Sequence, residues 1–325
     1  MLKEVSIEII RKCPNNCLHC SSLSDYSCNE AFDYDHFSSV VRNAEQMGAK
    51  TICLSGGEPF LHNRIIDMIK LVASLGLQSY VYTSGIALDE HMQRSALDRN
   101  ILKAISKDIT KLIFNIEAAN SDLYDEIMGT KDCFSKLKQS IHDAHSFSIE
   151  TEAHFVPMRI NLDNVEEVVA FCCDNNISRL SFLRLVLHGR ALSNEKHIAL
   201  SDDELSQLRV NLGRIKEHSK VDIRVGIPLS TDAPFHKCEA ANGKLNIRYD
   251  GKVFPCEVFK NERISKCLNG TRAESVYDRS LVDIYHDSPY LNIVREQTSR
   301  FSINNHCETC VGQHLLYKQE NDSNE

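Results

Sequence analysis

Short apolar runs alternate with segments of helical periodicity from the N-terminus to about residue 225, and this alternation limits the possible folds strongly. Strands alternating with helices are typically parallel and joined by right-handed crossovers. The sequence therefore predicts an α/β fold with one parallel sheet, although the pattern alone does not separate an open barrel from a flat, doubly wound sheet. The predicted strands are residues 5–10, 51–54, 79–83, 112–116, 152–156 and 180–186, with Asp222–Val225 as a weaker candidate.

Polar residues recur at every second position in several of these strands, which is unusual for parallel strands covered on both faces. We expect those faces to line a polar barrel interior, and we expect the active site at the carboxyl ends of the strands. The alternating pairs are Ser6 and Glu8, Tyr80 and Tyr82, Asn115 and Glu117, Glu152 and His154, and Phe182 and Arg184.

Three closely spaced cysteines, Cys13, Cys17 and Cys20, follow the first predicted strand. They supply three thiolates where an iron–sulfur cube needs four, which would leave one iron without a protein ligand. A metal site with an open position is typical of a centre that binds substrate or cofactor. The alternative is a zinc site formed by the three cysteines and His19.

The run Ser55-Gly56-Gly57-Glu58-Pro59 directly follows the second predicted strand. The cysteine loop after one strand and Gly-Gly-Glu-Pro after the next resemble the radical S-adenosylmethionine (SAM) superfamily, over residues 5 to about 316. The resemblance implies a partial (β/α)6 TIM-like barrel over residues 1–228. It also implies a [4Fe-4S] cluster whose fourth iron binds SAM, and a reductant such as flavodoxin or ferredoxin. An electron from the cluster would cleave SAM to a 5′-deoxyadenosyl radical that abstracts hydrogen from substrate.

The same resemblance assigns SAM-binding roles at the strand ends. Residues Ser55 to Pro59 would contact the methionine group, and Thr83 and Ser84 would lie near the ribose, where Ser84 replaces the usual asparagine. Glu117 and Arg184 are candidates for the SAM ribose and carboxylate, but a buried structural ion pair explains either residue equally well.

A second set of cysteines lies in the C-terminal third of the chain: Cys238, Cys256, Cys307 and Cys310. Asp250-Gly251 predicts a hairpin turn that brings Cys238 and Cys256 together. The spacing resembles SPASM and twitch domains, which implies a closed, second [4Fe-4S] cluster in residues 229–317. A zinc ribbon on the same four sulfurs is the alternative. Cys267 could replace one of the ligands, and residues 318–325 are expected to form a disordered tail.

Composition adds three expectations. No apolar run reaches the roughly 20 residues of a membrane helix. Thirteen cysteines in a chain without a secretion signal favour cytoplasmic metal chemistry over disulfides. The net charge of −8 argues against broad nucleic-acid binding.

The leading functional hypothesis is an oxidoreductase acting on a small sugar, cyclitol or nucleotide-like molecule, with the second cluster accepting an electron. Glu117, His154 and Glu152 are the candidate catalytic residues, although packing roles compete for each. The first alternative is a maturase that modifies a peptide or protein side chain; against it, the chain begins at its first core strand and leaves no room for a leader-binding domain. A non-catalytic metal-binding or redox-sensing protein is the alternative outside enzymes.

Overall fold

Alternating apolar residues build the central sheet of the protein. In strand β1 (Glu4–Ile10), Val5, Ile7 and Ile9 are fully buried, whereas Ser6 is half-buried. The computed structural model describes residues 1–226, 229, 238–261, 263–264, 268–300, 310–312 and 315. Within them, nine strands form one sheet in the order β11-β10-β1-β2-β3-β6-β7-β8-β9.

Seven of these strands carry the parallel core that the alternation predicts. Each pairs in parallel with its neighbour in the order β1, β2, β3, β6, β7, β8 and β9. Most observed boundaries lie within a residue or two of the predicted ones, but β8 ends at Phe182 rather than at residue 186, and β9 confirms the weaker candidate. The bounds are β2 (Thr51–Gly56), β3 (Gln78–Thr83), β6 (Lys111–Asn115), β7 (Thr151–Phe155), β8 (Arg179–Phe182) and β9 (Asp222–Val225).

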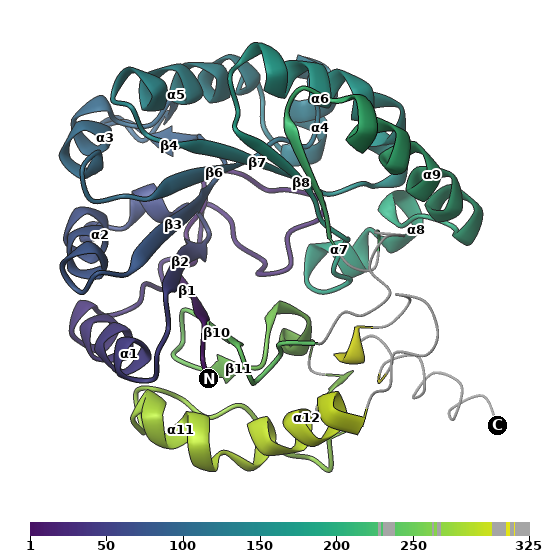
Figure 1. The fold of residues 1–325 in the computed structure, drawn as a ribbon. Coiled ribbons are helices and arrows are strands. Elements are labelled where there is room, and N and C mark those ends of the chain that lie inside the picture. The colour runs from purple at the N-terminus through teal and green to yellow at the C-terminus, as the bar shows by residue number, and fades with distance from the viewer. Residues whose placement is uncertain are drawn as a thin grey trace.

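Helices cover the outer face of the curved sheet (Figure 1). Their buried faces are apolar: in α1, Phe37, Val40, Val41 and Ala44 point inward. The main outer helices are α1 (Tyr34–Gln46), α2 (Ile65–Ser74), α3 (Arg99–Ile105), α5 (Phe134–Ser146), α6 (Val165–Asp174) and α9 (Asp202–His218). The shorter elements are η1 (Pro59–Leu61), β4 (Ala87–Leu88), β5 (Arg94–Ser95), α4 (Ser121–Met128), η2 (Arg159–Asn164), α7 (Arg190–Ser193) and α8 (Glu195–Ile198).

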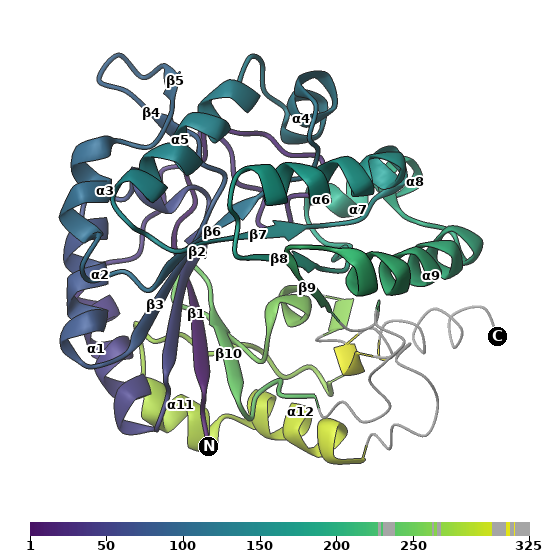
Figure 2. The ribbon, with the colours of Figure 1, turned by 45° about the horizontal axis from the view of Figure 1, so that its top comes forward.

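The C-terminal hairpin joins the same sheet. Strand β10 (Lys244–Ile247) pairs in parallel with β1, and β11 (Val253–Phe254) pairs antiparallel with β10. Helices α11 (Leu281–Asp287) and α12 (Pro289–Arg300) lie beyond the hairpin, and η3 (Glu257–Lys260) follows it (Figure 2). The hairpin predicted around Asp250-Gly251 is thus present, and it extends the barrel sheet next to the strand that precedes the cysteine loop.

The sheet is open, because β11 and β9 are its two edges. This confirms the predicted α/β class with an open, barrel-like core. The proposed domain boundary near residue 228 and the tail at 318–325 lie outside the described residues. None of the helices described is both long enough and apolar enough to cross a membrane.

Candidate functional site

A cavity of about 510 Å³ lies at the carboxyl ends of the barrel strands. Its wall includes all three N-terminal cysteines, Cys13, Cys17 and Cys20. Residues of the hairpin region, Asn246, Cys256 and Glu257, complete the opposite part of the wall. One cavity is therefore lined by the whole N-terminal cysteine set and by Cys256 of the C-terminal set. Its lining also contains the predicted residues Ser6, Glu8, Ser55, Gly56, Gly57, Tyr82, Ser84, Asn115, Glu117 and His154.

The cysteine loop is held in place through its backbone. The amide of Asn16 donates to the carbonyl of Met128 at 3.0 Å, and that of Leu18 donates to Ile127 at 2.9 Å. Arg190 Nε donates to the Cys17 carbonyl at 2.8 Å. The loop conformation is thus fixed by the end of α4 and by the start of α7.

Two glycines allow neighbouring segments to approach this loop closely. A Cβ on Gly57 would overlap the carbonyl oxygens of Arg11 and Lys12. Gly189 has a φ of +60°, and a Cβ there would lie 2.7 Å from the carbonyl oxygen of Cys20. Any larger residue at either position would have to displace the loop that carries the thiols.

The three thiols fit a cluster with one open iron. Burial raises the pKa of Cys13 and Cys17, while the Arg190 charge lowers that of Cys17. The described residues contain no group of three or more His, Cys, Asp or Glu side chains placed to hold a single metal ion. In a cube each thiolate binds a different iron, so the sulfurs need not converge on one point.

Unsatisfied polar atoms around the thiols also point to a missing group. Both side-chain polar atoms of Asn15 and the Nδ1 atom of His19 are buried without a hydrogen-bond partner in the described structure. Both residues line the cavity. Because buried polar groups are normally paired, these atoms fit a site that holds a polar cofactor.

Glu58 of the Gly-Gly-Glu-Pro run ties two strand ends together. It accepts hydrogen bonds from Thr83 Oγ1 at 2.7 Å, from Ser84 Oγ at 2.7 Å and from the Ser84 amide at 3.0 Å. It is fully buried, and burial raises its pKa to about 7 despite these donors. Glu58, Pro59 and Thr83 are not part of the cavity wall, whereas Ser55, Gly56, Gly57 and Ser84 are. The run therefore presents backbone and small side chains to the cavity, and Glu58 holds them in place.

Glu117 lies in the cavity wall beside the cysteine loop. Its Oε2 accepts from the Val156 amide at 2.8 Å, and its Oε1 lies 3.4 Å from His19 Nε2. Burial raises the pKa of Glu117 to about 8 and, together with the Arg190 charge, lowers that of His19 to about 4. Both groups are therefore mostly neutral at pH 7, so their contact is not an ion pair.

The other two catalytic candidates lie apart from each other. His154 lines the cavity, with its ring centroid 5.2 Å from that of Tyr82, and burial lowers its pKa to about 3. Glu152 is not in the wall; its Oε1 lies 2.5 Å from Lys111 Nζ and 3.7 Å from Arg179 Nη1. The geometry gives Glu152 a structural ion pair and leaves His154 available to a ligand.

Three C-terminal cysteines, Cys238, Cys256 and Cys310, lie near one another, because a charge on Cys310 raises the pKa of both Cys238 and Cys256. The pKa of Cys256 is raised to about 12, chiefly by burial and then by Cys310. The Arg184 charge lowers the pKa of Cys238 and of Cys256, and Arg184 Nη1 is buried without a hydrogen-bond partner in the described structure. Cys307 and Cys267 lie outside the described residues. Arg184, expected at SAM, is therefore placed beside the second set of thiols and not in the cavity wall.

A buried polar network connects the barrel to the C-terminal region. Lys260 Nζ contacts Glu8 of β1 and Glu257, and it lies 3.0 Å from Ser22 Oγ. Ser22 also donates to Glu8 at 2.8 Å. Since Ser22 follows Cys20 and Glu257 follows Cys256, the network fixes the two cysteine-bearing segments relative to each other.

Several residues of the site were not selected from the sequence. Arg190 lies in the run from Phe182 to Arg190, whose two arginines could not be distinguished without the fold. Arg224 of β9 lines the cavity, and its charge lowers the pKa of His154. Lys260 has no motif around it, so only the structure could identify its role.

Two family models match the chain. The radical SAM superfamily model matches residues 7–172, and the model of an iron–sulfur cluster-binding domain, SPASM, matches residues 238–311. Together they confirm the predicted pairing of a radical SAM core with an auxiliary cluster domain, and with it the cofactors SAM and [4Fe-4S] clusters.

Similar proteins span most of the chain. The PqqA peptide cyclase of Gluconobacter oxydans is 26% identical over 296 residues, covering 89% of this chain and 77% of the relative. That of Rhizobium meliloti is 21% identical, covering 89% of this chain and 74% of the relative. Among solved structures, Streptococcus suis SuiB bound to S-adenosylmethionine superposes with a TM-score of 0.74 at 17% identity, covering 91% of this chain and 68% of that chain. The structure of anSMEcpe with AdoMet and a peptide gives 0.68 at 12% identity, covering 93% of this chain and 84% of that chain. The two structures support the fold.

Proposed function

The chain belongs to the radical SAM superfamily, and from this premise we propose that it modifies a side chain of a peptide or protein substrate. The observation that carries the proposal is the similarity to PqqA peptide cyclases over 87% or more of the chain. The comparisons thus favour the peptide alternative over a sugar, cyclitol or nucleotide-like substrate.

The N-terminal loop would hold the first cluster through Cys13, Cys17 and Cys20. The bound cluster and SAM would supply a hydrogen-abstracting 5′-deoxyadenosyl group by one-electron cleavage of SAM. Ser55, Gly56, Gly57 and Ser84 would line the SAM subsite, with Glu58 as a positioning residue. Asn15 and His19 have unpaired polar atoms that suit a polar cofactor.

Substrate would enter the remaining part of the cavity, between the two cysteine sets. His154 and Tyr82 face that space, and Arg224 lies next to them. A neutral His154 can accept a hydrogen bond or a proton from substrate, and Glu117 can donate one. His154 and Glu117 would orient the substrate and exchange protons with it. Glu152, which is paired with Lys111, would only stabilise the barrel.

The C-terminal cysteines Cys238, Cys256, Cys307 and Cys310 would hold the auxiliary cluster. Cys256 lines the same cavity as the N-terminal loop, so a cluster held there would be suited to remove an electron from the substrate after hydrogen abstraction. Loss of a hydrogen atom, an electron and a proton makes the net reaction an oxidation. This assignment makes the protein an oxidoreductase.

The test is a comparison of substrate classes on the reconstituted, oxygen-protected protein with SAM and dithionite. We expect a pool of synthetic peptides to raise 5′-deoxyadenosine formation above the basal rate and to yield products that lack the mass of two hydrogen atoms. Cys256→Ala should retain 5′-deoxyadenosine formation but lose that product, whereas Cys173→Ala should keep both. Stimulation by sugars, cyclitols or nucleotides and not by peptides would overturn the proposal.

A further inference from the structure

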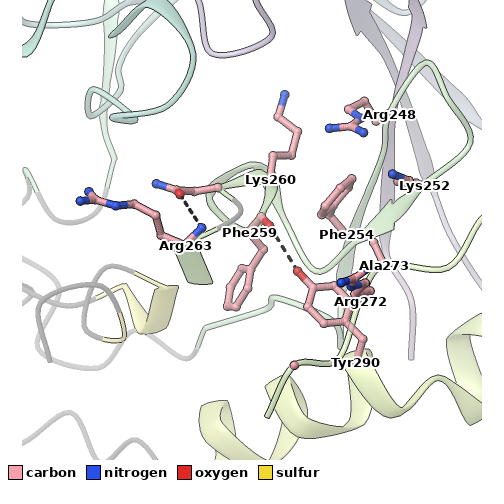
Figure 3. A pocket seen from close by; sticks show the side chains of 11 residues that line it. Arg248, Lys252, Phe254, Phe259, Lys260, Arg263, Arg272, Ala273 and Tyr290 are labelled. Atoms are coloured by element: carbon pink, nitrogen blue, oxygen red, sulfur yellow. Dashed lines mark hydrogen bonds between the residues drawn. The ribbon is translucent and has the colours of Figure 1, made fainter. Parts of the chain in front are cut away.

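A second cavity, of about 830 Å³, lies in the C-terminal region between the hairpin, η3 and α12 (Figure 3). No acidic side chain is among its described lining residues, although acidic residues outnumber basic ones in the chain as a whole. The basic lining residues are Arg248, Lys252, Lys260, Arg263 and Arg272.

Three of these basic side chains are exposed to solvent: Lys252, Arg263 and Arg272. The structure records no hydrogen bond or ion pair for the Arg272 guanidinium among the residues it describes. Arg248 is paired with Asp250, and Lys252 Nζ lies 3.7 Å from that same carboxylate. The wall thus keeps an excess of positive charge that a ligand can reach.

Three aromatic residues are among the remaining lining residues, with Asn261, Gly270 and Ala273. Phe254, Phe259 and Tyr290 are almost completely buried, and the Tyr290 hydroxyl donates to the Phe259 carbonyl at 3.2 Å. Figure 3 shows Arg263 on one side of Phe259, with Lys252 and Arg272 on the other. Cations spread around an apolar floor suit a ligand with several separated negative charges and apolar groups between them.

Lys260 separates this pocket from the central cavity. Lys260 lines the basic pocket, and its ammonium contacts Glu8 and Glu257, which line the central cavity. A chain bound in the basic pocket would therefore lie one side chain away from the space between the two cysteine sets.

We propose that this basic pocket binds an acidic segment of the peptide substrate and so anchors it beside the catalytic cavity. The inference rests on the proposed peptide-modifying function. A peptide fits better than a lone phosphate or carboxylate, because the volume exceeds the need of one small anion and the cations are dispersed around aromatic rings. Electrostatic complementarity of this kind chiefly sets specificity and the rate of encounter.

The test measures fluorescence anisotropy of the full chain with a labelled peptide, Glu-Phe-Glu-Glu-Phe-Glu, without SAM or reductant. The double variant Lys252→Glu/Arg272→Glu reverses two exposed charges of the pocket. Lys70→Glu/Lys103→Glu reverses two exposed charges on α2 and α3 and is the matched control. The milder double variant Lys252→Gln/Arg272→Gln removes the two charges without reversing them, and it is used if the charge reversal disturbs folding.

We expect the pocket reversal to weaken binding by about 10-fold or more, the glutamine pair to give an intermediate loss, and the control to stay within about twofold. Equal losses in pocket and control variants, or equal binding of Lys-Phe-Lys-Lys-Phe-Lys, would overturn the proposal. Displacement of the peptide by an equal concentration of inorganic phosphate would overturn it in favour of a small-anion site. Because no SAM is present, failure here is distinct from failure to modify peptides.

Discussion

The two cysteine-bearing regions are built in opposite ways. Cys13, Cys17 and Cys20 belong to one short loop, which donates hydrogen bonds to carbonyls of α4, accepts one from Arg190 of α7 and closely contacts Gly57. The C-terminal set is gathered from a segment before β10, a residue after β11 and a segment beyond α12. A local loop can leave one iron open to a cofactor, whereas ligands drawn from distant segments can enclose a cluster.

The largest expected effect is on 5′-deoxyadenosine formation, which should depend on the N-terminal cysteine loop. Cys17→Ala should reduce 5′-deoxyadenosine formation to background, because the first cluster would lose one of its three protein ligands. Cys173→Ala, a half-buried cysteine of α6, is the matched control and should keep the rate. Measurable SAM cleavage by Cys17→Ala would contradict the assignment of the loop.

The next effect tests the connection between the regions. Lys260→Met should lower the free energy of unfolding by about 3–5 kcal/mol, because Glu8 is left buried without its ammonium partner. The double variant Glu8→Gln/Lys260→Met removes the stranded charge and should recover much of that loss. Denaturant unfolding of both variants checks this, and an unchanged midpoint for Lys260→Met would mean that the network does not join the two parts.

A pH dependence near neutrality is expected from Glu58 on the barrel side. Glu58 has a pKa near 7 in the fold, above its ordinary 4.5, so folding takes up a proton between these values. Its contribution to stability is fully present below pH 4.5 and falls as the pH rises to 7, by about 3 kcal/mol at most. The free energy of unfolding of the wild type minus that of Glu58→Gln should therefore fall as the pH rises over this range. A value that stays constant or rises with pH would contradict the raised pKa.

The smallest effect concerns the close approach at the cysteine loop. Gly57→Ala should cost about 1–3 kcal/mol, because the new methyl group overlaps the carbonyls of Arg11 and Lys12. It should also lower the iron content after reconstitution. Gly213→Ala in α9 meets no atom within 4 Å and should be neutral or stabilising by about 1 kcal/mol. Equal thermal shifts for the two variants would argue against a tight fit at Gly57.

The same contrast explains what could be predicted from the sequence. The Cys13–Cys20 spacing is local, and the period-2 and 3.6 patterns report directly on backbone geometry, so the parallel sheet and the first cysteine set follow from the residues. The roles of Arg184 and Arg190 could not be predicted in this way. The two arginines are six residues apart in the sequence but lie at different cysteine sets, and only the path of the chain after β8 shows this. Glu152 shares a strand face with His154, yet Lys111 from the neighbouring strand engages its carboxylate. The contacts of Lys260 join residues 252 positions apart in the chain, a separation that no local pattern reports.

The central claim is that the N-terminal loop leaves one iron open and the C-terminal set does not. Electron paramagnetic resonance of the reduced, reconstituted protein tests it directly, with and without SAM. We predict two cluster signals, of which SAM shifts the one that disappears in Cys17→Ala and leaves unchanged the one that disappears in Cys256→Ala. A SAM-induced shift of the Cys256-dependent signal, or no shift of either signal, would contradict the account.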